Sequence, residues 1–296
     1  MKKMLFIMNP KAGQRKANKY LAEILTIFNR AGYLVEVFMT AGPGDGAQMA
    51  RSKGREVDLI VCCGGDGTFN EAVSGILSEG IHVPVGYIPA GTTNDFASSL
   101  KLPTSPVAAA RAIAEGKPIA YDAGRFCQRY FTYVASFGAF TKASYATPQS
   151  FKNALGHLAY VLEGIQELSQ IKKEHIRIEL DDGTVVEDDF LFGAISNTMS
   201  VGGVFTLDPK QVNLRDGLFE IFLIRAPRDI TEISECLQAL TTKKYNCQMI
   251  TFLTAKQMTV YAREDMSWTL DGEYFPGASE VRVENLMQSV QLMRKE

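Results

Sequence analysis

A glycine-rich pentapeptide that carries one carboxylate, Gly64-Gly65-Asp66-Gly67-Thr68, is the part of the sequence best suited to chemistry. The apolar run at 59–63 before it is typical of a buried strand, and Thr68-Phe69-Asn70-Glu71 fits a capping box that would start a helix. Backbone N–H groups at such a turn can bind phosphate oxygens, and the helix dipole favours the anion. Because Asp66 would repel phosphate unless Mg²⁺ bridged the two groups, the segment predicts a Mg²⁺-dependent nucleotide site.

The elements that would position this turn alternate between strand and helix along the first third of the chain. Strands are expected at 3–8, 33–39, 59–63 and 84–88, and helices at 17–31, 46–53 and 68–79. Apolar strands separated by helices indicate a parallel sheet that is covered on both faces. Ligands bind such sheets at the carboxyl ends of the strands, where several polar loops are therefore expected to converge on one ligand. These loops are 9–13, 40–45, 64–68 and 89–95.

From about residue 120 the pattern changes to shorter alternating segments joined by Asp-Gly turns, which predicts a mainly antiparallel sheet or sandwich. Strands are expected at 173–180, 185–197, 218–224, 249–254, 257–263 and 266–270, and helices around 150–170 and 229–240. The predicted fold class is thus α/β plus mainly β, with a cleft between the two domains. The domains are expected at 1–120 and 121–285, and the tail 286–296 is expected to return to the first domain.

Composition excludes several classes of function. A formal net charge of -2 gives no general attraction to nucleic acid, and 46% hydrophobic with 22% charged residues is typical of a globular chain. No segment approaches the roughly 20 apolar residues that span a bilayer, so any membrane contact would be peripheral. The five cysteines contain no C-x-x-C pair and the three histidines are scattered, which favours a reduced cytoplasm and argues against a zinc site.

Other phosphate-binding patterns are weak or absent in the sequence. Gly42-x-Gly44-x-x-Ala47 imitates a dinucleotide fingerprint, but the next strand ends in Cys62-Cys63, where an acidic ribose ligand would be expected. The two cysteines are interpreted as small buried hydrophobes. No G-x-x-x-x-G-K-[ST] string occurs, which excludes a P-loop enzyme.

The eight residues from Gly64 to Glu71 resemble the signature of the diacylglycerol kinase catalytic-domain family, which also contains sphingosine, ceramide and bacterial lipid kinases. The GGDG string alone is shared with NAD kinases and phosphofructokinases, so the order of all matching strings gives the resemblance its specificity. These strings span almost the whole chain: Asn9-Pro10-Lys11-Ala12-Gly13, the run Pro89-Ala90-Gly91-Thr92-Thr93-Asn94-Asp95-Phe96-Ala97, Asp122-Ala123-Gly124, Asn197 with Gly202-Gly203, Asp216-Gly217 and Asp271-Gly272-Glu273.

The resemblance implies that loops of the first domain bind ATP, with Lys11 as a counter-charge to phosphate. The implied nucleotide-binding residues are Asn9, Pro10, Lys11, Ala12, Gly13, Thr40, Gly64, Gly65, Asp66, Gly67, Thr68, Phe69, Asn70, Glu71 and Thr92. It also implies that Asp66, Asp95 and Asp122 hold catalytic Mg²⁺, directly or through water. Three carboxylates brought together by separate loops would repel one another at pH 7 without a cation.

Two of the implied metal positions have structural alternatives. Asp95 could equally cap the helix that Phe96-Ala97 would begin. A second Mg²⁺ site is implied at Asn213, Asp216 and Leu218, and a type I′ turn at Asp216-Gly217 is the alternative there. The triple glycine usual in the family is reduced to Gly202-Gly203-Val204.

The Asp-Gly pairs of the second half are ordinary hairpin signals when taken alone. For Asp182-Gly183 we keep that interpretation. Asp271-Gly272 is a hairpin signal between 267–270 and 273–275, but Glu273 after it matches the family's catalytic base. The resemblance therefore implies that Glu273 accepts the proton of a lipid hydroxyl during phosphoryl transfer, while Asp271 orients a water or a metal.

The sequence thus predicts an ATP- and Mg²⁺-dependent lipid kinase, of the kind that acts in phospholipid biosynthesis, with a diacylglycerol-like acceptor at the membrane surface. We expect it in the cytoplasm or at the inner face of the membrane, and a homodimer is compatible with the sequence. The apolar stripe at 151–171 fits a membrane-docking helix or, as the simpler interpretation, a core-facing one. Alternatives to the whole assignment are a kinase for a soluble acceptor such as NAD, and a catalytically silent nucleotide- or lipid-binding module.

Overall fold

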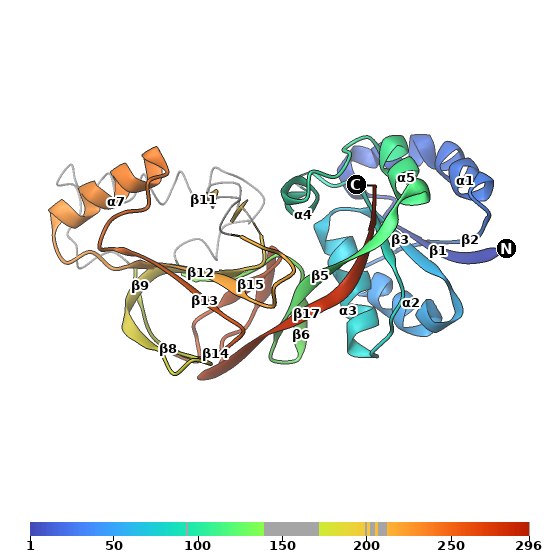
Figure 1. The fold of residues 1–296 in the computed structure, drawn as a ribbon. Coiled ribbons are helices and arrows are strands. Elements are labelled where there is room, and N and C mark those ends of the chain that lie inside the picture. The colour runs from blue at the N-terminus through green and yellow to red at the C-terminus, as the bar shows by residue number, and fades with distance from the viewer. Residues whose placement is uncertain (93, 139–171, 199, 202–204, 207–211, 296) are drawn as a thin grey trace. The chain divides into compact units, whose positions relative to one another are not determined.

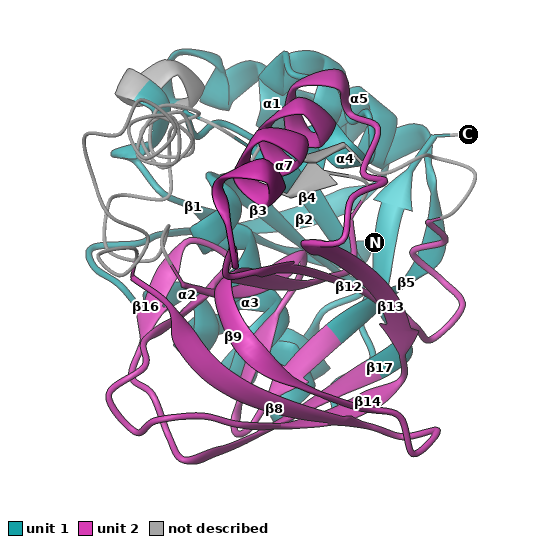
Figure 2. Ribbon diagram, turned by 90° about the vertical axis from the view of Figure 1, so that its left-hand side faces the viewer, with its two compact units in different colours: residues 1–123, 286–296 teal, residues 124–285 magenta. Residues whose placement is uncertain are grey.

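The computed structural model describes residues 1–92, 94–138, 172–198, 200–201, 205–206 and 212–295, with the side chains at 14–17, 200–201 and 205–206 excepted. The chain forms two compact units (Figure 2). Unit 1 comprises Met1–Ala123 and Leu286–Glu296, and unit 2 comprises Gly124–Asn285.

Unit 1 contains a parallel sheet with the strand order β4-β3-β1-β2. Its strands are β1 (Lys2–Met8), β2 (Tyr33–Met39), β3 (Leu59–Gly64) and β4 (Val85–Pro89). The C-terminal part of the long strand β17 (Glu280–Arg294) adds to this sheet, where Leu292 pairs in parallel with Val85 of β4. Cys62 and Cys63 are fully buried in β3, which confirms their interpretation as small hydrophobes.

Helices cover both faces of this sheet, as the sequence pattern predicts (Figure 1). Ile24 and Phe28 of α1 share a buried cluster with Ala109 and Ile113 of α5, against Phe6 of the sheet. The opposite face is covered by α2 and α3. The helical elements are η1 (Ala12–Tyr20), α1 (Leu21–Arg30), α2 (Asp45–Lys53), η2 (Gly54–Glu56), α3 (Asp66–Ser78), α4 (Asp95–Ser99) and α5 (Pro106–Glu115).

Two helix predictions differ from the structure at their starts. The helix expected at 17–31 begins as an α-helix only at Leu21, and a 3₁₀ segment precedes it. Residues 12–20 contain no leucine, isoleucine or valine, so an α-helix there would have no aliphatic stripe to bury. The helix expected from Thr68 begins two residues earlier, at Asp66, with the extended residue Gly65 at its N-cap.

Unit 2 is built from antiparallel pairs, as predicted. Its strands follow the order β16-β15-β7-β9-β8-β14-β17, while β12 pairs with β9 and β13 pairs with β12. The helix expected at 229–240 is α7 (Ile230–Thr242), whose N-cap Asp229 accepts from the Glu232 N–H. The helix expected at 150–170 lies outside the described residues. Strand β5 (Lys117–Phe126) begins in unit 1, and only its end, from Gly124 on, belongs to unit 2. The other strands are β6 (Arg129–Phe131), β7 (Val134–Gly138), β8 (Glu174–Leu180), β9 (Val185–Ser196), β12 (Phe219–Arg225), β13 (Ile250–Ala255), β14 (Gln257–Tyr261), β15 (Trp268–Leu270) and β16 (Glu273–Phe275), with the separate ribbon β10 (Ser200–Val201) and β11 (Phe205–Thr206).

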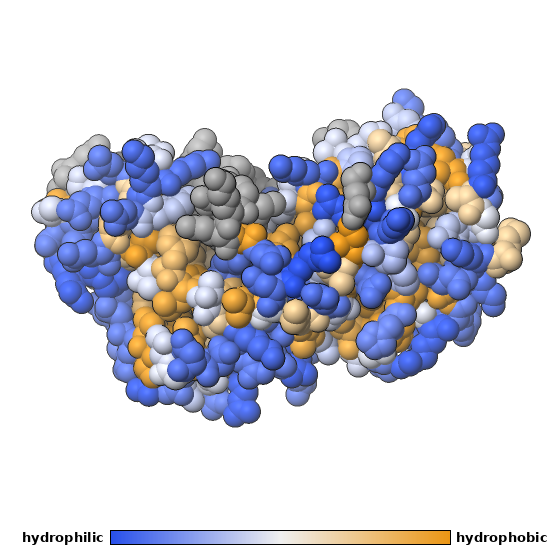
Figure 3. Space-filling model, viewed as in Figure 1, coloured by the Kyte–Doolittle hydropathy of each residue, from blue (hydrophilic) through white to orange (hydrophobic). Residues whose placement is uncertain are grey.

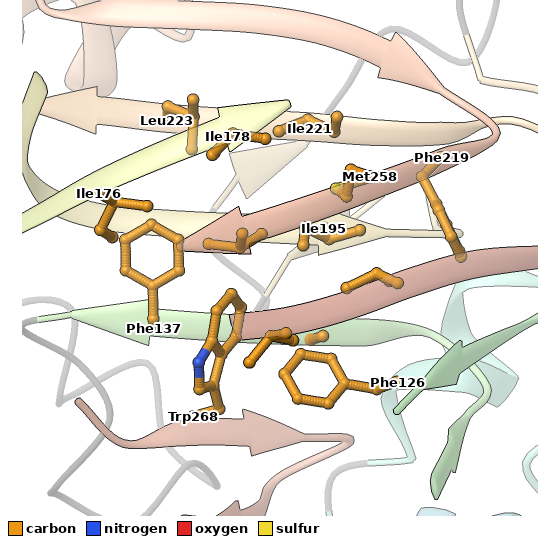
Figure 4. Packing of buried hydrophobic residues seen from close by; sticks show 14 of the residues in the cluster. Phe126, Phe137, Ile176, Ile178, Ile195, Phe219, Ile221, Leu223, Met258 and Trp268 are labelled. Atoms are coloured by element: carbon orange, nitrogen blue, oxygen red, sulfur yellow. The ribbon is translucent and has the colours of Figure 1, made fainter. Parts of the chain in front are cut away.

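The core of unit 2 gathers around Trp268 of β15 (Figure 4). Its indole makes edge contacts with Phe126 and Phe137, at ring-centroid distances of 4.8 and 5.0 Å. Because these side chains are fully buried, Trp268 is a core residue. The hairpin that contains Trp268 is therefore tightly packed against the core of unit 2.

Strand alternation separates this core from the surface. In β8, Ile176 and Ile178 are buried, whereas Arg177 is exposed and Glu179 is half-buried, and Figure 3 shows a mostly hydrophilic surface over β8 and β14. None of the helices in the part of the chain that the structure describes is long and apolar enough to cross a membrane.

Candidate functional site

The Gly64 to Thr68 turn joins β3 to α3 and lies directly beside the loop that follows β4. The Ala90 N–H donates to the Gly64 carbonyl at 2.7 Å. A Cβ placed on Gly91 would lie 2.6 Å from Gly65 Cα, so only glycine permits this approach of the two backbones. Two of the predicted ligand loops thus meet at the N-terminus of α3, where backbone N–H groups favour an anion.

The loop after β1 meets both of these segments through Asn9 and Gly13. The Asn9 N–H donates to the Cys63 carbonyl at 2.9 Å, and its Nδ2 lies 3.5 Å from Thr68 Oγ1. Asn9 Oδ1 accepts from the Lys11 N–H at 2.9 Å, which closes the loop on itself. Gly13 has a φ of 51°, and a Cβ there would lie 1.8 Å from the Ala90 carbonyl oxygen.

The loop after β2 is tied to α3 by Glu71. Its carboxylate accepts from the Gly44 and Gly46 N–H groups at 2.9 and 3.0 Å, so it satisfies the N-terminus of α2. The capping box predicted for Thr68 and Glu71 is therefore wrong, because the helix starts at Asp66 and Glu71 caps the neighbouring helix instead. All four polar loops expected at the sheet edge are linked by these contacts.

The side chains of the expected nucleotide-binding residues differ in whether they can contact a ligand. Phe69 is fully buried and stacks on Tyr87 and Phe96, so it shapes the turn from behind. Asn70 is 9% exposed, and its Oδ1 has no hydrogen-bond partner among the residues that the structure describes. Lys11 and Thr92 are exposed, and within the described part of the chain neither side chain makes a hydrogen bond or ion pair. They are the side chains best placed to reach solvent from these loops.

Asp66 is the partly buried carboxylate at the centre of the turn. Its Oδ1 accepts from the Tyr87 hydroxyl at 3.1 Å, and its Oδ2 accepts from the Asp95 N–H at 2.8 Å. Burial raises the pKa of Asp66 to about 6, and the nearby Asp95 carboxylate adds to this effect, although the hydrogen bonds from Asp95 and Tyr87 oppose it. Burial also raises the pKa of Asp95.

The capping alternative for Asp95 is wrong, since Asn94 holds the N-cap position of α4 with a φ of 52°. The Asn94 side chain instead accepts from the Gly91 N–H and donates to the Gly91 carbonyl, both at 2.9 Å. Asp95 is therefore the first residue of the helix, and its carboxylate lies near that of Asp66.

Asp122 is 2% exposed, and its carboxylate accepts from the Gln288 N–H at 2.7 Å. Within the ranges that the structure describes, no three His, Cys, Asp or Glu side chains form a group that could hold a metal ion. The structure thus brings Asp66 and Asp95 together without adding Asp122 to the same group.

The pair Asp66 and Asp95 fits a bound Mg²⁺ ion. Both carboxylates have raised pKa values because of burial, so a cation beside them would offset the cost of keeping them charged. Mg²⁺ in phosphate-binding sites commonly uses one or two protein carboxylates and takes its remaining ligands from phosphate and water. The donor set therefore suits a cation that is shared with a nucleotide.

The second implied cation site forms a short turn in unit 2. The Asp216 N–H donates to the Asn213 carbonyl at 3.4 Å, and Asp216 Oδ1 accepts from the Leu218 N–H at 3.1 Å. Gly217 has a φ of 80°, but Asp216 does not have a positive φ, so the type I′ alternative is wrong. The metal role of these residues stays a prediction.

The Asp271-Gly272 pair forms the predicted two-residue hairpin between β15 and β16. Positive φ values of 49° at Asp271 and 89° at Gly272 match a type I′ turn. The Asp271 carboxylate is buried and accepts four hydrogen bonds, from the N–H and hydroxyl of Thr132 and from the N–H groups of Tyr133 and Val134, at 2.6 to 3.0 Å. Burial raises its pKa to about 6, whereas these bonds lower it.

Glu273 lies at the exposed start of β16, opposite Leu270. The hairpin that carries it is fixed to residues 132–134 by Asp271, whose acceptor positions are filled by protein donors. Asp271 therefore positions the hairpin, its expected role toward a water or metal stays a prediction, and Glu273 is exposed to solvent.

Replacing Asp271 by alanine should lower the free energy of unfolding by about 3–5 kcal/mol, because it leaves three buried N–H groups without an acceptor. Urea or thermal unfolding measures this change. Asp182→Ala is a matched control, since Asp182 is an exposed hairpin residue that accepts from the Thr184 N–H at 2.8 Å. We expect it to cost less than about 1 kcal/mol. Equal costs for the two variants would contradict the structural role of Asp271.

Sequence reasoning missed Tyr87 and Asn94, which bond to Asp66 and Gly91 respectively. One signal for Tyr87 exists, because it is the one hydroxyl-bearing residue in the apolar strand expected at 84–88. A buried tyrosine hydroxyl needs a partner, so its position next to the Pro89 loop indicates a polar contact there.

Comparison with known proteins agrees with this arrangement. Residues 3–126 match the diacylglycerol kinase catalytic domain, and residues 134–294 match the YegS C-terminal NAD kinase beta sandwich-like domain. The diacylglycerol kinase of Bacillus subtilis strain 168 is 34% identical over 276 residues, which is 93% of this chain and 90% of the relative. That of Staphylococcus saprophyticus is 32% identical, over 92% of this chain and 89% of the relative.

Solved structures also resemble this chain. A crystal structure from Bacillus anthracis strain Sterne, assigned as a diacylglycerol kinase, superposes with a TM-score of 0.80 at 26% identity, over 99% of this chain and 95% of the other. Yeast NADH kinase in complex with NADH has a TM-score of 0.53 at 12% identity and shares the fold alone, over 100% of this chain and 84% of the other. The family models and the relatives thus support a kinase. The chain belongs to the diacylglycerol kinase family.

Proposed function

We propose that the chain transfers the γ-phosphoryl group of ATP to a hydroxyl group of diacylglycerol or a related lipid, in a Mg²⁺-dependent reaction. The observation that carries this proposal is the close approach of Gly65 to Gly91 at the N-terminus of α3, with the Asp66 carboxylate at its centre. The relatives named diacylglycerol kinase support the choice of a lipid acceptor.

In this proposal the loops of unit 1 hold the phosphates of ATP through backbone N–H groups, and Lys11 adds a positive charge. A Mg²⁺ ion at Asp66 and Asp95 would offset the negative charge of the phosphates and of the two carboxylates. Asp122 would act through water, and the turn at Asn213, Asp216 and Leu218 would hold a second cation.

Glu273 is the proposed general base. As the acceptor oxygen forms its bond to the γ-phosphorus, the hydroxyl proton passes to the Glu273 carboxylate, and ADP leaves with the electrons of the broken P–O bond. A carboxylate oxygen can accept this proton. Asp271 fixes the hairpin that carries Glu273, and this limits the positions that the Glu273 carboxylate samples.

The test is an incubation of the purified chain with Mg²⁺, labelled ATP and a total lipid extract in mixed micelles, followed by mass spectrometry. We expect a lipid species that has gained one phosphoryl group. NAD in a parallel incubation tests the soluble-acceptor alternative. Phosphorylation of NAD without any lipid product would overturn the proposal, and tight ATP binding without any product would favour a silent binding module.

We further propose that the chain acts from the cytoplasm at the inner face of the membrane, because its acceptor would be a membrane lipid. Binding would then be peripheral and reversible. Sedimentation with vesicles that contain diacylglycerol tests this, and a chain that stays in the supernatant at every vesicle concentration contradicts it. Sedimentation velocity in the same buffer tests a homodimer.

A further inference from the structure

Tyr87 connects the interior of unit 1 to the Asp66 carboxylate. It is 2% exposed on β4, and its ring stacks on Phe69 with a centroid distance of 4.7 Å and an interplanar angle of 28°. Its hydroxyl lies 3.1 Å from Asp66 Oδ1 and 3.3 Å from Asn94 Oδ1. The packing fixes the ring, so the hydroxyl oxygen has one position between these two acceptors.

The Tyr87 hydroxyl has one proton for two acceptors, and donates to only one of them at a time. Asn94 Oδ1 already accepts from the Gly91 N–H at 2.9 Å. A charged acceptor forms the stronger hydrogen bond, so the proton is directed to the Asp66 carboxylate.

The two oxygens of Asp66 are thus held by different donors, Tyr87 on Oδ1 and the Asp95 N–H on Oδ2. The terminal torsion of an aspartate is broad and roughly two-fold, so one donor on each oxygen is what fixes the plane of the carboxylate. A ligand that is fixed before binding loses less freedom when the cation arrives. Phenylalanine at position 87 would pack equally well but would remove the hydroxyl that donates to Oδ1.

We propose that Tyr87 is a positioning residue for Asp66, whose hydroxyl orients the carboxylate for a divalent cation that is shared with a nucleotide. This inference rests on the proposed function, since it concerns the metal site of the same reaction. Tyr87 does not touch the reacting atoms. It acts through the orientation of Asp66, while its ring belongs to the core of unit 1.

The test compares Tyr87→Phe with Tyr33→Phe, which removes the hydroxyl of a buried tyrosine on β2 of the same unit. Binding of Mn²⁺ in the presence of a non-hydrolysable ATP analogue is followed by electron paramagnetic resonance of the free ion. We expect Tyr87→Phe to weaken Mn²⁺ binding by about 10- to 150-fold, the loss of one hydrogen bond to a charged group, and Tyr33→Phe to change it by less than about 2-fold. Thermal unfolding of both variants shows whether they remain folded.

Kinetics give a second readout that a purely structural role would not move. The Mg²⁺ concentration for half-maximal activity should rise in Tyr87→Phe by the same factor, with kcat recovered at saturating Mg²⁺. A double-mutant cycle with Asp66→Asn separates direct from indirect action. If Tyr87 acts through Asp66, then Tyr87→Phe has no further effect on Mn²⁺ binding in the Asp66→Asn background.

The inference is overturned if folded Tyr87→Phe binds Mn²⁺ as tightly as the natural chain does. It is also overturned if the effects of Tyr87→Phe and Asp66→Asn on Mn²⁺ binding simply add in the double variant. It is also overturned if the natural chain binds no Mn²⁺ with the nucleotide, because no cation is then present to position. Weaker Mn²⁺ binding by Tyr87→Phe in a protein that phosphorylates no lipid would leave the inference standing and contradict the proposed function. The two failures are therefore distinguishable.

Discussion

Glu273→Gln should lower kcat for lipid phosphorylation by about 10²- to 10⁴-fold, because glutamine keeps the shape of the side chain but cannot accept the proton of the acceptor hydroxyl. The KM for ATP should stay within about 2-fold of the natural value, because the proposed ATP-binding residues all lie in unit 1 and none is changed. The measurement is steady-state transfer from labelled ATP to diacylglycerol in mixed micelles. Because Glu273 is exposed, the free energy of unfolding should change by less than about 0.5 kcal/mol.

Glu264→Gln is the matched control for this result. Glu264 is an exposed glutamate of unit 2 on the segment before β15, and within the described residues its side chain makes no hydrogen bond or ion pair. Its substitution should leave kcat unchanged. If Glu273→Gln retained more than about a tenth of the natural kcat, the assignment of Glu273 as the base would be wrong.

The parts of the site that follow from local chemistry could be predicted from the sequence. An apolar run before Gly64-Gly65-Asp66-Gly67-Thr68 allows only a strand and a turn, and the loops that follow the parallel strands must share one sheet edge. For the same reason the antiparallel character of unit 2 and the hairpins at Asp182-Gly183 and Asp271-Gly272 are confirmed. Each of these depends on residues adjacent in the chain.

The parts that depend on which loop meets which could not be predicted. Glu71 has the spacing of a capping box, yet it bonds to Gly44 and Gly46, which lie 27 and 25 residues earlier in the chain. Asp271 has a strong turn signal, but its four hydrogen bonds come from residues 132–134, more than a hundred positions away. A local pattern shows what a side chain can do, and the tertiary fold decides which partner it finds.

Helix α5 and the contacts of Tyr87 also show that a local sequence pattern does not identify the tertiary partners of a residue. Pro106 at the start of α5 and the alanine-rich run after it are ordinary helix signals. Their importance comes from burial, since Ala109, Ala110 and Ile113 of α5 share the cluster of Phe6 and Val61. The sequence predicts that a buried tyrosine such as Tyr87 needs a hydrogen-bond partner. Only the structure identifies Asp66 as that partner.

Asp66→Asn should lower kcat by about 10²- to 10⁴-fold, the size expected when about 3–5 kcal/mol of charge stabilisation by the cation is lost. The amide removes the negative charge that would hold the cation, while its volume hardly changes. The same EPR titration of Mn²⁺ with an ATP analogue should show weaker binding, in parallel with the loss of lipid phosphorylation. A variant that retained natural Mn²⁺ affinity would exclude Asp66 as a ligand.

The stability of Asp66→Asn should move in the opposite direction from its activity. Burial raises the pKa of Asp66 to about 6, above its ordinary value of 3.8 in the unfolded chain, so the folded state favours the neutral form. The stability that this proton contributes is complete below pH 3.8 and is lost as the pH rises through about 6. A neutral amide escapes that loss, and we expect the variant to be up to about 2 kcal/mol more stable than the natural chain at pH 8 without Mg²⁺.

The surroundings of Asp66 can accept this amide without a new unpaired group. Its oxygen can keep the hydrogen bond from the Asp95 N–H, and its NH₂ group can donate to the Tyr87 oxygen, while the Tyr87 hydroxyl turns to Asn94 Oδ1 at 3.3 Å. A variant that is inactive yet at least as stable as the natural chain would separate a functional carboxylate from a structural one. If Asp66→Asn were clearly less stable at pH 8, the carboxylate would be holding the two loops together, and its loss of activity would no longer identify a cation ligand.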